Sequence, residues 1–397
     1  MALSKIDVAN MLTGATPVAN GGTALTSGFV NGKDPRPDAK PIIYNGDMAV
    51  AQRGTSFTGV SSGSNFPVDR FEFYPTNLGA YTIIQEALTS GEAYNNGFRT
   101  ALRIDTTTAD ASPASTDYAI LRTKFEGKDL GLFKKGTSNA EKFTLAFWVK
   151  SNKTTTGQVN LFDIDNNRLV SGTYATSSAN TWEKKVINFP ADTTGGFDND
   201  NALSLIVEFF LDSGSNFSSG TAPTAWEAQT NADRNANNFA IGSSTDNDFA
   251  LTGVQLEVGE FSSTTIPPFQ FENFGDNLQR CQRYFNILMN SSAERTDSIN
   301  AHIHDNDTMR GSIHFPVEMR STPSITSSSS GSADHWRYIS NGINTNYGSA
   351  ITMSASSKSA QFTLVDTGGT NVSGNVNEPG QLFNNTTSCF LKIDAEL

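Results

Sequence analysis

Two of the four histidines in the chain, His302 and His304, stand at alternate positions in the segment NAHIHDND. Alternate residues of a β-strand point to the same face, so the pair would offer two nitrogen ligands to a transition metal. Two ligands do not complete a metal site. The sequence therefore favours the simpler interpretation, a polar strand end beside a turn.

Oxygen-bearing side chains cluster in the segment FDIDNNRL, where Asp163 and Asp165 precede two asparagines. Oxygen ligands at alternate positions suit Ca²⁺, but the segment lacks the glycine and the distal glutamate of an EF-hand loop. Residues 198–201 form a similar cluster. Asp and Asn also favour hairpin turns for local reasons. Calcium at Asp163 and Asp165 is thus an alternative to an ordinary turn, and no other cofactor is expected.

Of the common catalytic motifs, HExxH, the phosphate-binding loop and GxGxxG are absent, and the one GxSxG match, GVSSG at 59–63, falls in a Gly- and Ser-rich turn segment and not at the strand-to-helix turn of a nucleophile elbow. Glycoside cleavage needs two carboxyl groups that are paired in space, and a sequence cannot exclude such a pair. Solvated strand and turn acids are the simpler interpretation, so we expect a protein that is not an enzyme. The best-placed acids are Glu86, Glu92, Asp163, Asp165 and Glu208.

Aromatic side chains carry a different chemistry, because an aromatic ring can stack on the C–H face of a sugar. Trp148 and Trp182 lie in regular strand patterns and are expected to be core residues. Other aromatic residues lie in or beside Ser- and Gly-rich segments, and loops on a rigid scaffold often carry binding. We expect these to contact a glycan or partner, the alternative being that they anchor loops. They are Trp226, Trp336, Tyr338 and Tyr347.

The elements that would hold these residues are β-strands. Between residues 41 and 271, alternating segments rich in aromatic and β-branched residues are separated by Gly-, Ser-, Asn- and Asp-rich turns. In FTLAFWVK at 143–150, every second residue is large and apolar. This pattern predicts a jelly-roll β-sandwich over 41–272. The predicted strands are Asp69–Tyr74, Tyr81–Gln85, Phe98–Ile104, Tyr118–Lys124, Phe143–Lys150, Gln158–Asp163, Trp182–Phe189, Leu203–Leu211 and Leu251–Val258.

Residues 273–290 predict a joint between two domains. Leu278, Cys281 and Phe285 recur at helical spacing, so a short helix is expected, with an N-cap at 276–277. The arginines at 280 and 283 are expected to pair with Glu272, with Asp276 or with a neighbouring subunit.

A second, smaller β-sandwich is expected over 284–397. Its turns are rich in Ser, Gly and Asn. Its predicted strands are Arg283–Met289, Ser298–Ile303, Met309–Val317, Ile351–Met353, Ala360–Val365 and Ser388–Ala395.

Composition limits the class of partner. The 397 residues carry a net charge of −12, which disfavours nucleic acid and anionic lipid as partners. No segment has the length and apolarity for membrane insertion. The chain shows no signal peptide, so synthesis in a cytoplasm is expected. Cys281 and Cys389 have no zinc-ligand spacing, and the sequence neither requires nor excludes a disulfide between them.

Residues 1–40 show no sustained apolar periodicity and end in a proline-rich linker, KDPRPDAKP. Such a segment cannot bury its apolar residues by itself. An arm that folds on a partner or in an oligomer is therefore expected, and packing copies around one axis would remove its apolar side chains from water. The expected attachment and oligomerisation residues are Val18, Leu25, Phe29 and Val30.

Four motifs together resemble a known family. They are TPVANGGTALTSG (16–28), YNGDMAVAQRGTSF (44–57), FTLAFWVKS (143–151) and FALTGVQLEVGEFSSTTIPPFQFENFGDNLQRCQRYF (249–285). This set resembles tail fibres and related minor structural proteins of tailed bacteriophages, with Phe285 where the pattern often has a second tyrosine. The middle region is also similar to carbohydrate-binding modules of the jelly-roll type.

The resemblance implies a homotrimeric virion protein in an adsorption appendage, such as a short tail fibre made in the host cytoplasm. Its N-terminal arm would attach to other tail or capsid proteins, and its β domains would contact host cell-surface polysaccharide. One alternative is a structural head fibre, decoration protein or fibre adaptor without receptor binding. A glycan hydrolase or esterase is a further alternative, which the lack of a catalytic motif in its usual structural context disfavours.

Overall fold

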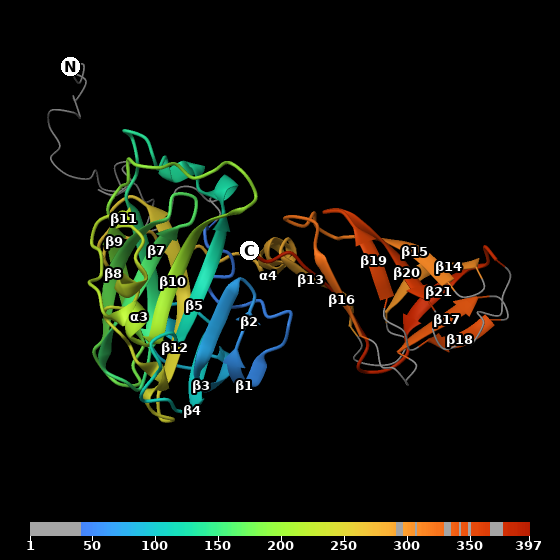
Figure 1. Ribbon diagram of the computed structural model, residues 1–397, viewed down its shortest axis with the longest axis horizontal. Helices are drawn as coiled ribbons and strands as arrows, with labels where there is room; N and C mark the ends of the chain where they lie inside the picture. Colours follow the sequence, from blue (N-terminus) through green and yellow to red (C-terminus); the bar gives the residue numbers. More distant parts are fainter. Residues whose placement is uncertain are drawn as a thin grey trace, which may run out of the picture.

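The computed structural model describes residues 41–290, 297–305, 308–328, 335–340, 343–347, 351–365 and 376–397. The regular structure of these residues is almost entirely β, in a larger and a smaller domain that meet near helix α4, Phe274–Gln282 (Figure 1). The all-β prediction is confirmed. None of the described helices has the length and apolarity to cross a membrane. Outside the described residues lie the predicted arm and its apolar residues Val18, Leu25, Phe29 and Val30.

The larger domain is a jelly-roll β-sandwich. Its described strands follow the order β11-β8-β7-β10-β5-β3-β4-β12-β6-β9, and β1 and β2 also pair with β3. The sheet curls so that β8, near one end of this order, packs closely against β9 at the other end. The approach is so close that a Cβ added at Gly172 on β8 would lie 2.4 Å from the Ile187 side chain on β9. The strands are β1 Ser56–Ser62, β2 Asn65–Val68, β3 Phe71–Ala87, β4 Thr100–Thr108, β5 Tyr118–Glu126, β6 Phe143–Lys150, β7 Thr155–Asp163, β8 Arg168–Thr176, β9 Glu183–Phe189, β10 Leu203–Ser213, β11 Glu227–Ala228 and β12 Asp248–Val258.

Strand β3 belongs to both layers of the sandwich. Its residues 72–76 pair with β5, whereas residues 80–87 pair with β4. Between them Asn77 and Gly79 have φ angles of 52° and 60°. A Cβ at Gly79 would lie 2.2 Å from the main-chain oxygen of Thr108, so only glycine fits this bend. The two segments predicted at 69–74 and 81–85 are thus one bent strand.

The sandwich core contains the alternate residues of β6 that the sequence assigned to the inner face, and all four are 0% exposed. The other face of β6 is covered as well. There Trp148 and Trp182 pack with Phe98 in a second apolar cluster. The prediction that both tryptophans are core residues is confirmed, although they lie outside the main core.

The smaller domain also contains two described sheets, ordered β13-β22-β16 and β18-β17-β21-β14-β15-β20-β19. Its apolar core includes Met309, Trp336, Phe362 and Leu391. Its strands are β13 Phe285–Asn290, β14 Ser298–Asp305, β15 Thr308–His314, β16 Ser324–Ser327, β17 Trp336–Ser340, β18 Ile343–Tyr347, β19 Ile351–Ala355, β20 Ser359–Val365, β21 Pro379–Asn384 and β22 Phe390–Asp394.

Helix α4 forms where a short helix was predicted, but its cap lies earlier in the chain. The Asn273 side chain accepts the Asp276 N–H at 2.9 Å, so the predicted cap at 276–277 is wrong. Arg280 pairs with Glu272 at 2.5 Å, one of its predicted partners. The two cysteines are buried and free.

A buried carboxylate joins the two domains. Glu126, at the end of β5, is 2% exposed and forms an ion pair with Arg283, whose Nη2 lies 2.6 Å from one carboxylate oxygen. Arg283 Nε lies 2.8 Å from its other oxygen, which also accepts the Tyr284 hydroxyl at 2.6 Å. Three charged or polar groups from the two domains therefore fix how the smaller domain leaves the larger one.

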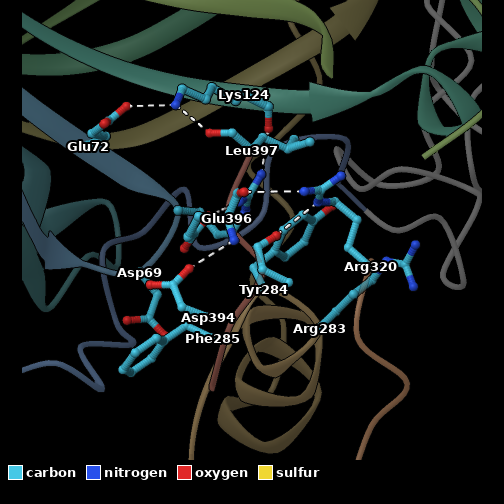
Figure 2. Close-up of polar contacts among 12 residues, drawn as sticks. Asp69, Glu72, Lys124, Arg283, Tyr284, Phe285, Arg320, Asp394, Glu396 and Leu397 are labelled. Atoms are coloured by element: carbon cyan, nitrogen blue, oxygen red, sulfur yellow. Dashed lines mark hydrogen bonds and ion pairs between the residues drawn. The ribbon is translucent and has the colours of Figure 1, made fainter. Parts of the chain in front are cut away.

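The last residues of the sequence return to this junction (Figure 2). Arg53 Nη2 lies 3.1 Å from Asp394 and 3.3 Å from Glu396. Arg70 pairs with Glu396, and its guanidinium lies 3.4 Å from the centroid of the Tyr284 ring. Cations of the jelly roll thus face acids at the end of β22 and just after it.

Glu126→Gln keeps the size of this side chain but removes its charge, which leaves the Arg283 guanidinium without its carboxylate. Breaking such a pair costs about 3 kcal/mol. We expect calorimetry to show the smaller domain unfolding separately and at a lower temperature. Glu141→Gln, which breaks an exposed pair with Lys134, is the control. Equal thermograms for both variants would contradict this role of Glu126.

Candidate functional site

One outer face of the jelly roll carries a row of polar residues across four strands. In register order, Asn160 on β7 lies beside Glu208 on β10, then Arg122 on β5, then Glu72 on β3. Cross-strand neighbours are close enough for side-chain contact. The sheet register therefore brings these residues together from distant parts of the sequence.

The carboxylates of this row are paired. Glu72 accepts Arg122 Nε at 2.6 Å and Lys124 Nζ at 2.9 Å. Glu208, which is 0% exposed, pairs with Arg234 Nη2 at 2.5 Å. Burial alone would raise the pKa of the Glu72 carboxyl, but the hydrogen bond and charge of Arg122 and the charge of Lys124 lower it to about 2.

The neighbouring rows carry aromatic side chains. Tyr74 and Tyr118 are partly exposed, with ring centroids 6.1 Å apart and planes inclined by 14°. Phe217, from the short helix α3 (Ser215–Ser218), meets Tyr118 edge-on at 5.1 Å. We call Tyr74, Tyr118, Phe217 and Arg122 the tyrosine face. Its rings and the guanidinium stand on one side of a rigid sheet.

The tyrosine face has unused hydrogen-bonding groups. The Arg122 guanidinium lies 5.0 Å from the centroid of the Tyr74 ring and donates its Nε–H to Glu72. Among the described residues, its remaining N–H groups and the two tyrosine hydroxyls have no hydrogen-bond partner. An aromatic surface beside free donors can bind a molecule that has both C–H faces and hydroxyl groups.

A loop covers the part of this outer face that lies over β7. Gln158 Nε2 donates to the Asp233 main-chain oxygen at 2.7 Å, and Asn160 Nδ2 donates to that of Arg234 at 2.8 Å. These bonds hold the segment around the 3-10 turn η4, Asn231–Asp233, over β7. The open part of the face therefore lies over β5 and β3.

The predicted contact residue Trp226 is not available to a ligand, and that prediction is wrong. The side chain is 8% exposed and packs in the main core of the jelly roll. Its Nε1–H donates to the Pro190 main-chain oxygen at 2.8 Å. Trp226 therefore anchors its loop, which is the alternative that the sequence left open. Its Ser- and Gly-rich neighbours did not indicate this burial.

Trp336 and Tyr338 are also wrongly predicted as contacts. Both are 0% exposed, because they face the core from strand β17. Their polar atoms bond to main-chain oxygens, Trp336 Nε1 to Ser328 at 3.3 Å and the Tyr338 hydroxyl to Glu378 at 2.8 Å. Tyr347 is on β18, opposite Trp336, and its side chain lies outside what the structure describes.

The structure also corrects the calcium alternative. Asp163 is 0% exposed and pairs with Lys135 Nζ at 2.5 Å, so an ammonium already neutralises the carboxylate. Asp165 instead accepts the main-chain N–H of Asp198 at 2.9 Å. Within the described ranges, no three His, Cys, Asp or Glu side chains gather to hold a metal.

The other candidate ligands and acids lie apart. Glu86 pairs with Arg103, and Glu92 lies in the first turn of the short helix α2, Glu92–Asn95. His302 and His304 lie on one face of β14, as predicted, with ring centroids 6.3 Å apart. No third ligand joins them in the described part of the chain.

The residues of the tyrosine face were missed although a sequence signal for them existed. Tyr74 ends one predicted strand and Tyr118 begins another. Their alternation with buried Phe73 and Ala119 places both tyrosines on an outer face. The sequence could not show that these two strands are neighbours, since that follows from β3 pairing with β5.

Comparisons with known proteins give distant structural likenesses alone. No family model and no curated protein matches the chain. The enzymatically active domain of bacteriophage CBA120 tailspike protein 4 aligns at a TM-score of 0.28 and 12% identity, over 55% of this chain and 21% of that chain. TmCBM61, in complex with β-1,4-galactotriose, aligns at a TM-score of 0.25 and 9% identity, over 55% of this chain and 99% of that one.

A further likeness is to a family 11 carbohydrate-binding module from Clostridium thermocellum, in complex with a mixed-linked tetrasaccharide. It has a TM-score of 0.25 and 10% identity over 52% of this chain and 98% of that one. The jelly-roll assignment rests on the sheet topology described above. The ligand must be argued from the residues of this chain.

The pairing of Glu72 predicts a pH-dependent stability. With a pKa lowered from 4.5 to about 2, Glu72 stabilises the fold above pH 4.5, on the order of 3 kcal/mol, and this contribution is lost as the pH falls toward 2. Urea unfolding should therefore show Glu72→Gln less stable than wild type at pH 7, with the difference vanishing toward pH 2. Glu260→Gln, at an exposed pair with Lys142, is the control. A Glu72→Gln difference that is constant with pH would contradict the assignment.

Proposed function

We propose that this chain is a glycan-binding protein and that the tyrosine face is its contact surface. The proposal rests on one observation, the two partly exposed and nearly parallel tyrosine rings beside an arginine with unused donors. Sugar rings present apolar C–H faces and hydroxyl groups together. Tyrosine rings can stack on the C–H faces, while the tyrosine hydroxyls and Arg122 form hydrogen bonds with the sugar hydroxyl groups.

The sheet supplies the rigidity that such a site needs. Tyr74 and Tyr118 stand on hydrogen-bonded strands, and Glu72 holds the guanidinium of Arg122. Little side-chain freedom is then left to lose on binding. A flat and partly exposed surface still binds each sugar weakly, so useful affinity would come from several copies acting together.

We further propose that the protein belongs to a bacteriophage adsorption appendage, a short tail fibre in the virion. The support is the set of four sequence motifs, above all the segment 249–285. In this role the N-terminal arm attaches the chain to other tail or capsid proteins, and the glycan is host cell-surface polysaccharide.

A structural adaptor or decoration protein is the second candidate function. The observation that favours it is the polar junction, because residues from β5, from the segment just after α4 and from the segment after β22 hold the two domains in one arrangement. A fixed arrangement suits a spacer between two other virion proteins. No glycan contact would then be needed.

Tyr118→Ala should weaken binding of host-surface polysaccharide about tenfold, because it removes one stacking surface. Tyr94→Ala is the matched control, since Tyr94 is also partly exposed and an arginine, Arg99, lies 4.1 Å from its ring centroid. Binding is measured by isothermal titration of the full chain with polysaccharide extracted from the host.

The two candidate functions predict different results. Equal affinities for wild type and both tyrosine variants would exclude the tyrosine face as the site. Absence of any binding by the folded wild-type protein would favour the adaptor function.

The trimer is tested by native mass. We expect sedimentation equilibrium at micromolar concentration to give three times the chain mass of 42.6 kDa. A monomer mass under these conditions would contradict the trimeric assembly. It would leave the tyrosine face untouched, since that face is formed within one chain.

A further inference from the structure

The smaller domain has a groove on the outer face of its larger sheet. The groove runs across β21, β14, β15, β20 and β19 and has a volume of about 840 Å³, within the range of sites for small ligands. Most of its lining residues are polar. The side chains that matter for the argument are Asn300, His302, His304, Arg310, Gln361 and Thr363.

The sheet register orders these side chains around Arg310. His302 on β14 lies directly opposite Arg310 on β15, and Arg310 lies opposite Thr363 on β20. Thr363 in turn lies opposite Thr352 on β19. Because cross-strand neighbours are within reach of one another, a ligand on Arg310 would also meet a histidine on one side and hydroxyl groups on the other.

The groove differs in charge from the rest of the chain. Its lining, as far as the structure describes it, contains an arginine and two histidines and no Asp or Glu. The whole chain has a net charge of −12. Arg310 is exposed, and among the described residues it forms no ion pair. A negative ligand would therefore meet an unneutralised guanidinium here.

The rest of the lining suits an acidic sugar. A guanidinium binds a carboxylate through two parallel hydrogen bonds. The surrounding amides, hydroxyls and imidazoles match the hydroxyl groups of a sugar, which both donate and accept hydrogen bonds. A metal ion fits less well, because in the described residues the two histidines have no third ligand.

We infer that this groove is a second glycan site, which takes an acidic polysaccharide and binds its carboxylate at Arg310. The inference deepens the proposed function by naming a charged class of glycan. It does not depend on the tyrosine face, since the two surfaces lie on different domains. His302 and His304 position the sugar beside the carboxylate, through hydrogen bonds to its hydroxyl groups.

The test uses the full chain and fluorescently labelled oligogalacturonate, with its methyl ester as the matched neutral probe. We expect the acid to bind, the ester to bind at least about tenfold more weakly, and Arg310→Gln to cause a similar loss. His302→Gln/His304→Gln should weaken binding about threefold. Arg337→Gln is the control, because Arg337 lies on β17 of the same sheet, outside the groove, and contacts Asn344.

Other outcomes would overturn the inference. These are equal binding of acid and ester, full binding by Arg310→Gln, or no binding of the acid at millimolar concentration. Equal binding of dextran sulfate and single-stranded DNA with the same dependence on Arg310 would show an unselective cationic patch. Arg310→Gln tests this groove and Tyr118→Ala tests the tyrosine face of the other domain, so failure of this site and failure of the tyrosine face are distinguishable.

Discussion

The arrangement of the whole molecule depends on the need to neutralise carboxylates where its two domains meet. Glu126 lies out of water and carries a charge whose desolvation is costly unless donors surround it. Arg283 and Tyr284 supply these donors from the segment that leads into the smaller domain. Moving that segment away would leave the Glu126 carboxylate buried without its donors. One buried charge therefore restricts the position of the whole smaller domain.

The same principle links the junction to the tyrosine face. Lys124 Nζ contacts both Glu72 and the main-chain oxygen of Leu397 (Figure 2). Glu72 in turn holds Arg122, which lies beside the Tyr74 ring. A hydrogen bond and two ion pairs therefore connect the domain contact to the candidate site. Glu72 and Lys124 therefore affect both the orientation of the Arg122 guanidinium at the surface and the packing of Leu397.

The sequence predicted elements well where one local pattern decides them. Strand β6 has its predicted limits, because its apolar alternation is regular. The candidate site was predicted poorly, since its parts depend on contacts between distant residues. The partner of Asp163 is Lys135, on a separate segment, and no spacing reveals that pair. Trp336 was assigned to a loop because Ser-rich turns precede it, although the alternation in HWRYIS already indicated a strand with the tryptophan inside.

The register of β13 with β22 has a consequence for how such chains diversify. Phe285 and Asp394, the first residue of one strand and the last of the other, are paired partners. The chain thus leaves the jelly roll and comes back to it at nearly the same point. A foreign domain with adjacent first and last strands can replace residues 286–393 without moving Tyr284 or Glu396. Exchange of the smaller domain at this position would keep the jelly roll intact.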